Sequence, residues 1–506
     1  MFRSIIDCGR LLRAGWVLAR YDALVPKEIA HLAPGPLKLL GAISRIGTRG
    51  RGLRPGQRLA KALSGQGPAY IKFGQLLATR PDIIGFEVAE DLRELQDRMR
   101  PFSIEKAQYE VERAIGAPID TVFTEFSAPI AAASVAQVHK ATLSSGQQVA
   151  VKVLRPKIER KAEREFRAFL LGAKFLQGTF KSIKRMEPVK FIETLRKAAA
   201  VELDLRIEAG AASELKDHLK DEDKIRIPNI IWEYSSRRVL TIEWIDGVSV
   251  SNIDALDKQG VDRAALAQKV MQSFLSQALE RGFFHADMHQ GNLLVDLDGC
   301  LVFIDFGIMG RLDEQSRRVF AEILYGFIRR DYHAAAKAHF DAGYVPSHYS
   351  VDAFATALRS VGEPIFGRDA NKMDMSKVLQ QLFDVTDVFD MHLRPELVLL
   401  QRTMVVVEGV TRIIDPQINM WATAEPVVKA YIAKRVGPRA ILGQAKSNAN
   451  AALSLFEAFP QFAEAAETAA QQLLDGGITL SDDTVDRLAD AIRGKKRRDK
   501  KGQPAA

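Results

Sequence analysis

The stretch from His285 to Asn292 holds the residues of this chain best placed to do chemistry. It reads HADMHQGN, so an asparagine follows Asp287 by five residues and a histidine precedes it by two. This spacing is typical of the catalytic loop of a phosphotransferase. Asp287 could orient an attacking hydroxyl or water and accept its proton, and the amide oxygen of Asn292 is a hard ligand that suits Mg²⁺.

Two further motifs extend this chemistry. The sequence DFG follows an apolar run and places Asp305 thirteen residues after Asn292, where its carboxylate would be a second magnesium ligand. The sequence VAVK ends in Lys152, a lysine on a predicted strand that would hold the α- and β-phosphates of a nucleotide. Each motif alone is weak, and Asp287 and Asp305 could instead be turn residues that cap helices. Together, in this order, the motifs predict binding of ATP and Mg²⁺.

A lysine on a strand needs an acidic partner to hold it, and the stretch ELDLRIE offers several. Glu208 is the partner that we predict for Lys152, and Asp204 lies four residues before it on the same face of a predicted helix. Like charges at this spacing repel each other unless a cation lies near them. In the alternative interpretation the stretch is a solvated acidic face, on which Glu202 pairs with Arg206.

The segment 129–136, with the sequence PIAAASVA, stands where a phosphate-binding loop is expected. Such loops are rich in glycine, which permits positive φ and a close approach of the backbone to phosphate. Alanine restricts both, so we expect a stiffer loop with altered nucleotide preference or weak phosphoryl transfer. The residues predicted to cover the nucleotide are Ala131, Ala132, Ala133, Ser134 and Ala136. The alternative is a buried turn that contacts no ligand.

A small sheet and several helices must position these residues. Alternating apolar residues predict strands at 122–126, 135–143, 149–154, 239–244, 293–295 and 301–304. Helical periodicity covers 59–113 with a break at Pro81, then 157–218, and it dominates after Arg263. This order predicts a two-lobed α+β protein. Its expected segments are an amphipathic and linker segment (1–58), a helical extension (59–121), an N-terminal lobe with a helical insert (122–246), an enlarged helical C-terminal lobe (247–437) and a tail (438–506).

Composition and charge narrow the function classes. The chain has 506 residues, 47% hydrophobic and 26% charged, which excludes collagen-like, coiled-coil and wholly disordered proteins. Most of the net charge of +8 lies in 493–501, where seven basic residues and one acid give +6. Nucleic-acid binding would rest on this tail alone, and we do not expect it. Two cysteines, Cys8 and Cys300, form neither a disulfide framework nor a thiolate metal site and indicate a reducing compartment.

The sequence predicts no transmembrane helix, because it has no run of about 18 apolar residues. In residues 2–30, arginines are interspersed with apolar residues such as Leu12 and Trp16. This segment could be an amphipathic helix on a membrane surface, a transit peptide, or a helix packed on the body of the protein. We expect a cytoplasmic protein, with peripheral contact to the inner membrane face as a further option.

Taken together, these motifs resemble the UbiB family of atypical protein-kinase-like proteins. The resemblance extends over residues 59–416 and rests on four pieces: the sequence KFGQ at 72–75, the alanine-rich loop, the sequence ELD at 202–204, and HAD through Asn292. It implies a protein-kinase-like fold whose N-terminal extension covers the nucleotide pocket. Lys72 and Gln75 would then reach into the place of a peptide substrate, with Lys72 near Glu202 and Asp204.

The resemblance also assigns roles. Lys72 joins Asp287, Lys152 and Glu208 as a catalytic residue. Gln75, Glu202 and Asp204 join the nucleotide-binding set, together with Glu243 and Ile245 of the segment VLTIEWIDG, whose backbone would bind adenine.

Members of the family resemble ATPases or atypical kinases that support ubiquinone biosynthesis at a membrane surface. The resemblance therefore implies ATP and ADP as ligands. It adds a lipid or quinone precursor and other quinone-biosynthesis enzymes as partners. Many members end in membrane-spanning helices, whereas residues 438–494 here are amphipathic at best. Membrane attachment would then be peripheral, through the N-terminal helix, the basic tail or a partner.

Two other functions stay open. Small-molecule kinases of the aminoglycoside or choline phosphotransferase type also carry a His-x-Asp loop with a second histidine, here His289. The helix with Lys72 and Gln75 argues against this function, because it would block the substrate site. A non-catalytic, nucleotide-sensing scaffold would suit the alanine-rich loop, but it does not explain the complete set of charged residues.

Overall fold

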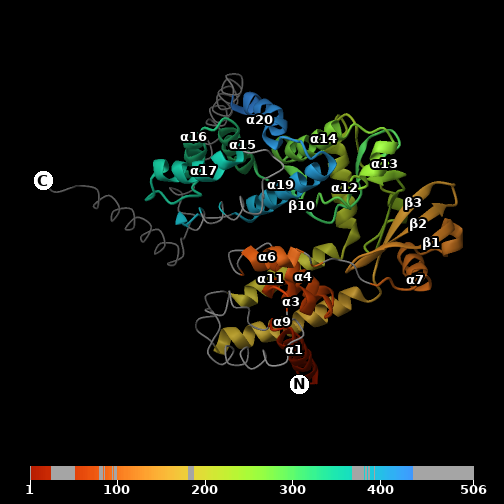
Figure 1. Ribbon diagram of the computed structural model, residues 1–506. Coiled ribbons are helices and arrows are strands. Elements are labelled where there is room, and N and C mark those ends of the chain that lie inside the picture. The colour runs from red at the N-terminus through yellow and green to blue at the C-terminus, as the bar shows by residue number, and fades with distance from the viewer. Residues whose placement is uncertain are drawn as a thin grey trace, which may run out of the picture. The chain divides into compact units, whose positions relative to one another are not determined.

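The computed structural model describes residues 2–23, 52–78, 84, 86–93, 95, 100–179, 187–366, 381, 385, 388–391 and 394–436 (Figure 1). The chain divides into two compact units, Met1–Tyr431 and Ile432–Ala506, and every contact discussed below lies in the first. The predicted break at Pro81, residues 24–51 of the predicted linker segment, the stretch 438–494 and the basic tail lie outside the described residues.

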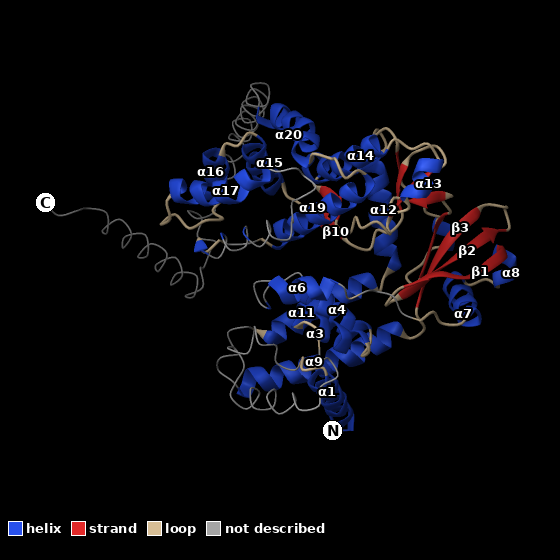
Figure 2. Cartoon of the chain, in the orientation of Figure 1, coloured by secondary structure: helices blue, strands red, loops and turns tan. Residues whose placement is uncertain are grey.

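The first sheet of the fold is antiparallel and has four strands in the order β1-β2-β3-β5 (Figure 2). Side chains of a strand point alternately to its two faces, and Val149, Val151 and Val153 are fully buried on one face. Ala150 and Lys152 lie on the other face. The elements are α7 (Ile104–Ile115), α8 (Ile119–Val122), β1 (Phe123–Ala132), β2 (Ala136–Leu143), β3 (Gln148–Leu154) and β5 (Val239–Glu243), with both helices packed on the valine face.

The alanine-rich segment differs from the prediction. Strand β1 continues through Ala132, and Ala131 and Ala132 pair with Val138 and Gln137 of β2. The connection between the strands therefore shortens to Ala133–Val135. Glycine inside a strand is less stable than alanine, so alanine at 131 and 132 allows the pairing to continue where a glycine-rich sequence would favour a looser loop.

A group of helices precedes and interrupts the sheet. Helix α1 packs against α9 and α3, as one of the three interpretations of the N-terminal segment expects. Leu63, Val88 and Leu92 lie in the core of this helical group. The helices are α1 (Phe2–Arg20), α3 (Pro55–Ser64), α4 (Pro68–Ala78), α6 (Phe86–Arg93), α9 (Ile158–Thr179), α11 (Pro188–Glu202) and α12 (Leu205–Leu219).

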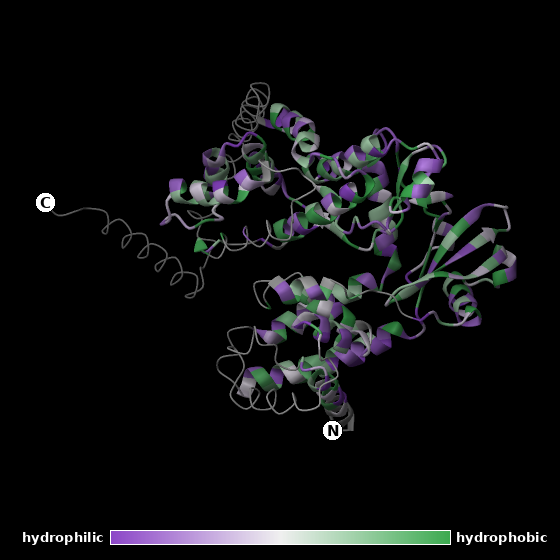
Figure 3. Ribbon diagram, viewed as in Figure 1, coloured by the Kyte–Doolittle hydropathy of each residue, from purple (hydrophilic) through white to green (hydrophobic). Residues whose placement is uncertain are grey.

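The C-terminal half is mainly helical, and Figure 3 shows hydrophobic and hydrophilic residues alternating along its helices. The short helix η2 (Trp232–Tyr234) packs beside β5 of the first sheet. The helices of the C-terminal half are α13 (Ile253–Lys258), α14 (Arg263–Ser276), η3 (Gln277–Arg281), α15 (Glu314–Ile328), α16 (Tyr332–Asp341), α17 (Val351–Phe366), α19 (Pro395–Ile414) and α20 (Met420–Val436). Within the described residues, no helix is both long enough and apolar enough to span a bilayer.

Short strands between these helices carry the catalytic-loop motif. A second sheet has the order β4 (Ile225–Arg226), β9 (Leu301–Phe303), β8 (Leu293–Asp296) and β6 (Gly247–Ser249), and a separate ribbon pairs β7 (Phe283–His285) with β10 (Met309–Arg311). Phe284, Phe303 and Phe306 of this region are almost fully buried. These apolar anchors fix the strand ends from which the polar residues of both motifs project.

Candidate functional site

Lys152 of β3 contacts two carboxylates that are distant in sequence. Its Nζ lies 2.6 Å from Glu208 Oε1 and 2.8 Å from Asp305 Oδ2. Glu208 belongs to the first turn of α12 and Asp305 follows β9, so the three side chains join the first sheet to the C-terminal half. The ion pair between Lys152 and Glu208 that the sequence predicts is present.

Burial and charge together set the protonation of this cluster. Burial by itself raises the pKa of Asp305, but the Lys152 ammonium outweighs it and lowers that pKa to about 2. Burial alone would lower the pKa of Lys152, whereas Asp305 and Glu208 raise it above its ordinary value. The pKa of Glu208 is raised by burial and by the nearby negative charge of Asp305. The cluster therefore holds a firmly charged lysine and aspartate beside a glutamate that protonates more readily than usual.

His285 holds the two motifs of the C-terminal half together. Its Nε2 hydrogen-bonds the carbonyl oxygen of Asp305, and its Nδ1 accepts a hydrogen bond of 3.1 Å from the Asp287 N–H. Burial lowers the pKa of His285, which favours the neutral ring with a proton on Nε2. This tautomer satisfies both contacts, so the histidine aligns Asp287 with Asp305.

Asp287 and Asn292 lie at opposite ends of one tight loop. Asn292 Nδ2 donates to the Asp287 carbonyl at 3.0 Å and lies 3.5 Å from Asp287 Oδ2. With the nitrogen engaged, Oδ1 is the amide atom left to bind a cation. An amide oxygen and a carboxylate form a donor set that suits Mg²⁺. The pair that the sequence predicts is Asn292 and Asp305, and within the described residues no three or more His, Cys, Asp and Glu side chains gather as an alternative metal cluster.

Lys72 of α4 forms an ion pair with Glu202, the last residue of α11. The helix predicted to run through 202–208 is interrupted at Leu203 and Asp204, which corrects the prediction that Asp204 and Glu208 share a helix face. Asp204 instead caps α12 by accepting a hydrogen bond from the Arg206 N–H, and its carboxylate binds the Arg206 guanidinium. The alternative pairing of Glu202 with Arg206 is therefore not observed.

Gln75, predicted to bind the nucleotide, lies about one turn after Lys72 on α4 and is half-buried.

The predicted adenine-binding segment follows β5. The Glu243 side chain binds the Arg226 guanidinium and accepts hydrogen bonds of 3.1 and 2.9 Å from the N–H and Nδ2 of Asn229. Burial alone would raise the pKa of Glu243, but these contacts outweigh burial and lower that pKa. The backbone N–H of Trp244 donates to the Gln148 carbonyl at 3.1 Å, and the Ile245 side chain is buried. The contacts fix the backbone of 243–245 beside the sheet.

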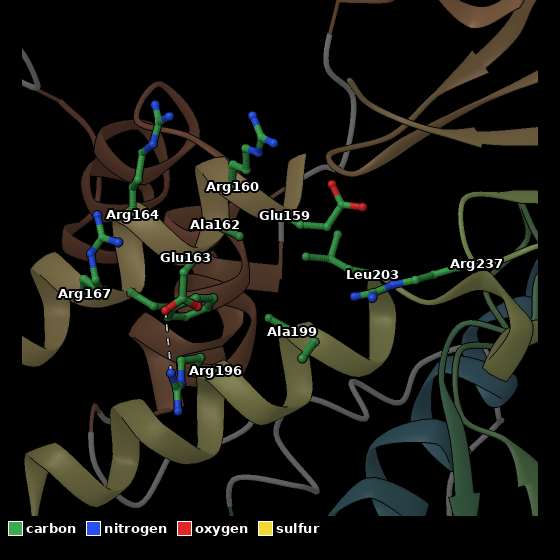
Figure 4. A pocket seen from close by; sticks show the side chains of 12 residues that line it. Glu159, Arg160, Ala162, Glu163, Arg164, Arg167, Arg196, Ala199, Leu203 and Arg237 are labelled. Atoms are coloured by element: carbon green, nitrogen blue, oxygen red, sulfur yellow. Dashed lines mark ion pairs between the residues drawn. The ribbon is translucent and has the colours of Figure 1, made fainter. Parts of the chain in front are cut away.

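A groove of about 440 Å³ lies between α9 and α11, and its lining includes Leu203, the residue between Glu202 and Asp204 (Figure 4). Its lining includes Arg160, Arg164, Arg167, Arg196 and Arg237, and none of the predicted site residues. Arg196 reaches toward Glu163 at 3.6 Å, whereas Arg164 points away from α11. The arginines do not converge on one point, so we assign this groove no role.

Sequence reasoning missed two arginines near the site. Arg226 bridges Glu243 and Asp296, which lie seventeen and seventy residues from it in sequence. Arg155 directly follows β3 and contacts the turn after β1. Neither residue belongs to a motif, and their partners are distant, so no local pattern could have identified them.

Two family models and several curated relatives match this chain, and they point to the same family. Residues 94–339 match the ABC1 atypical kinase-like domain and residues 358–419 match the UbiB helical domain. A probable protein kinase UbiB from Marinobacter nauticus is 39% identical over 93% of this chain and 86% of its own length. The chain belongs to the UbiB family. Similar relatives occur in Xanthomonas campestris (39% identity, 86% of this chain, 80% of the relative) and Aliivibrio fischeri (37%, 88% and 82%).

Membership of the UbiB family confirms the predicted kinase-like fold. A solved structure of Rv3197 in complex with erythromycin, from Mycobacterium tuberculosis, matches with a TM-score of 0.50 and 23% identity over 70% of this chain and 90% of that one. At this identity the match bears on the fold alone. The ABC1 region contains Lys152, Glu208, Asp287 and Asp305, whereas Lys72 precedes it. The relatives' name, probable protein kinase, fits a kinase-like enzyme.

Proposed function

We propose that this UbiB-family chain binds ATP with Mg²⁺ and hydrolyses it, or transfers its terminal phosphoryl group to a small or lipid-like molecule, in support of ubiquinone biosynthesis. The contact of Lys152 with both Glu208 and Asp305 carries the proposal. A lysine placed in this way is supported by one carboxylate while it faces a candidate magnesium ligand. This is the arrangement that nucleotide phosphates require.

Each residue of the cluster has a separate task in this proposal. Lys152 holds the phosphates, and Glu208 keeps its ammonium group in position. Asp305 and Asn292 hold Mg²⁺, which when bound neutralises charge on the phosphate oxygens. Asp287 orients the attacking oxygen and accepts its proton. Because the Asn292 side chain is hydrogen-bonded to the Asp287 carbonyl, the residue that accepts the proton stays at a fixed position relative to the magnesium ligand.

The helical extension bears on the identity of the phosphate acceptor. Lys72 is tied to Glu202, two residues before the cap of α12, the helix that carries Glu208. Gln75 lies on the same helix as Lys72, and we propose that both residues restrict access to the nucleotide. Such a restriction favours water or a small acceptor over a protein substrate. ADP would bind the same residues after the reaction.

Nucleotide binding is directly testable by isothermal titration calorimetry. We expect ATP to bind in the presence of Mg²⁺ with a Kd in the range of about 1 μM to 1 mM. Removal of Mg²⁺ by EDTA should weaken binding at least about tenfold, because the phosphates then face Asp305 without a cation between them. The variant Asp298→Asn changes an exposed carboxylate on the β8–β9 turn and serves as control. Absence of magnesium-dependent binding would contradict the proposal.

We further propose that α1 makes the peripheral membrane contact. Ala14 is buried against the body, whereas Leu12 and Trp16, four residues apart, are 75% and 59% exposed. Arg20 lies over the Trp16 ring at 5.0 Å, and the helix carries four arginines and one aspartate. An exposed apolar pair with a basic surround suits an anionic lipid surface.

Vesicle co-sedimentation tests this contact. Wild-type protein should sediment with vesicles that contain about 30% anionic phospholipid and much less with zwitterionic vesicles. The double variant Leu12→Glu/Trp16→Glu should lose most of the bound fraction, because it removes the apolar contact and adds negative charge. Tyr109→Glu alters an exposed aromatic residue of α7 and is the matched control. Equal sedimentation of all three proteins would refute the role of α1.

A further inference from the structure

Arg155 holds the short turn that stands where a phosphate-binding loop is expected. Its Nε and Nη2 donate to the Ala133 carbonyl at 3.1 and 2.8 Å, and its backbone N–H donates to the Val135 carbonyl at 2.8 Å. Ala133 N–H donates in turn to the Ala136 carbonyl at 2.8 Å. The turn is therefore fixed from the end of the same strand that carries Lys152.

The same guanidinium also contacts residues 100–102, the linker that precedes α7 within the helical extension. Arg155 Nη1 donates to the Arg100 carbonyl at 3.0 Å, and its guanidinium carbon lies 5.7 Å from the centre of the Phe102 ring. Gln137, buried on β2, bonds both the N–H and the carbonyl of Phe102, at 3.0 and 3.3 Å. Residues 100–102 are thus attached to the sheet next to the turn.

A hydrophobic contact connects the turn with the extension on a second side. Ala136, which follows the turn, is buried in the cluster that contains Ala69 of α4. Val135 and Phe73 pack against this cluster. Because α4 also carries Lys72, the turn and the Lys72 ion pair belong to one continuous packed region.

The chemistry of arginine suits this position. A hydrogen bond from a charged donor is stronger than one between neutral groups. The planar guanidinium can serve two carbonyls in fixed directions, which a lysine ammonium cannot reproduce. Burial lowers the pKa of Arg155, so this partly desolvated cation depends on its carbonyl partners. The Arg155 guanidinium is thus a direct link between the Ala133 carbonyl and the Arg100 carbonyl.

We propose that Arg155 is a positioning residue that couples the 100–102 linker of the helical extension to the Ala133–Val135 turn, so that the extension sets the position of this turn over the nucleotide phosphates. Only the statement that the turn lies over the nucleotide phosphates rests on the proposed function. The coupling between the linker and the turn rests on the contacts of Arg155 alone. It assigns to Arg155 a task separate from that of Lys152, three residues earlier.

A double-mutant cycle between Arg155 and Lys72 tests the coupling. Lys72→Met removes the ion pair with Glu202 and should shift the Kd for Mg²⁺–ADP at least about fivefold in a chain with Arg155. In the Arg155→Gln background the same change should shift the Kd less than about twofold. Arg155→Lys should fall between, since it keeps the charge but not the paired hydrogen bonds. Arg160→Gln, on an exposed arginine of α9, should leave the full response intact.

Hydrogen exchange of the peptide that covers 129–136 gives a readout that needs no nucleotide. Lys72→Met and Arg155→Gln should each speed its exchange, and the double variant should add little to either, because both act through the same connection. Additive effects, in exchange or in Kd, would overturn the inference. If the wild type binds no nucleotide, the proposed function fails while the exchange measurement still decides the coupling. Thermal unfolding of each variant verifies that it is folded.

Discussion

Replacement of Asp305 by asparagine should lower the kcat for magnesium-dependent ATP hydrolysis by roughly 10³-fold, or about 4 kcal/mol of transition-state stabilisation. Asparagine has the same shape and can still accept the 3.0 Å hydrogen bond from the Gly307 N–H. It lacks the charge that holds Mg²⁺ and that faces Lys152. The expected loss of rate is therefore electrostatic, and urea unfolding separates it from the stability that the Asp305 charge contributes through its contact with Lys152. Initial rates of phosphate release measure the loss of rate.

Asp298→Asn provides the comparison for this experiment, because it makes the same chemical change on an exposed turn. Its rate should equal that of the wild type. Unchanged hydrolysis in Asp305→Asn would remove Asp305 from the proposed site. A variant that loses hydrolysis but still supports ubiquinone synthesis in cells would instead favour the nucleotide-sensing scaffold.

Replacement of Lys152 by methionine should have the largest effect on stability. It leaves Glu208 and Asp305 close together without the cation that both contact. Removal of one partner from a buried charge pair destabilises a protein strongly, and we expect a loss on the order of 3 kcal/mol near pH 7. Urea unfolding measures the loss. Lys174→Met, on an exposed lysine of α9, should change stability by less than about 0.5 kcal/mol.

The pH dependence of this loss has a definite sign. The pKa of Asp305 is lowered to about 2 in the folded wild type, below its unfolded value near 4, so its contribution to stability is present above about pH 4 and disappears toward pH 2. The wild type and Lys152→Met should therefore converge as the pH falls through this range. Protonation of Glu208, whose pKa is already raised, acts in the same direction in the variant. A constant difference between pH 7 and pH 3 would contradict this account of the cluster.

Local patterns alone predicted the parts of the site that one short segment forms. The five-residue spacing of Asp287 and Asn292 describes a single loop, in which the Asn292 side chain donates to the Asp287 carbonyl and lies 3.5 Å from its carboxylate. Alternation along VAVK places Lys152 opposite the buried valines without knowledge of any other strand. The prediction of Glu208 as the partner of Lys152 joined two segments that lie 56 residues apart. It was possible because a lysine on a strand needs a carboxylate partner and the stretch ELDLRIE offers only three acids.

Tertiary structure decided the contacts that join distant segments. The pairing of Lys152 with Asp305 spans 153 residues, and no local pattern indicated it. The pairing of Lys72 with Glu202 spans 130 residues, and only the family resemblance indicated it. The break at Leu203 and Asp204 was not predicted either, since ELDLRIE has ordinary helical periodicity and only the cap at Asp204 reveals the new helix. The contacts of Arg155 with Ala133 and Arg100 likewise depend on where the extension packs. A sequence states which side chains can hydrogen-bond or carry charge, but the partner of each is chosen by the burial of apolar faces that brings remote segments together.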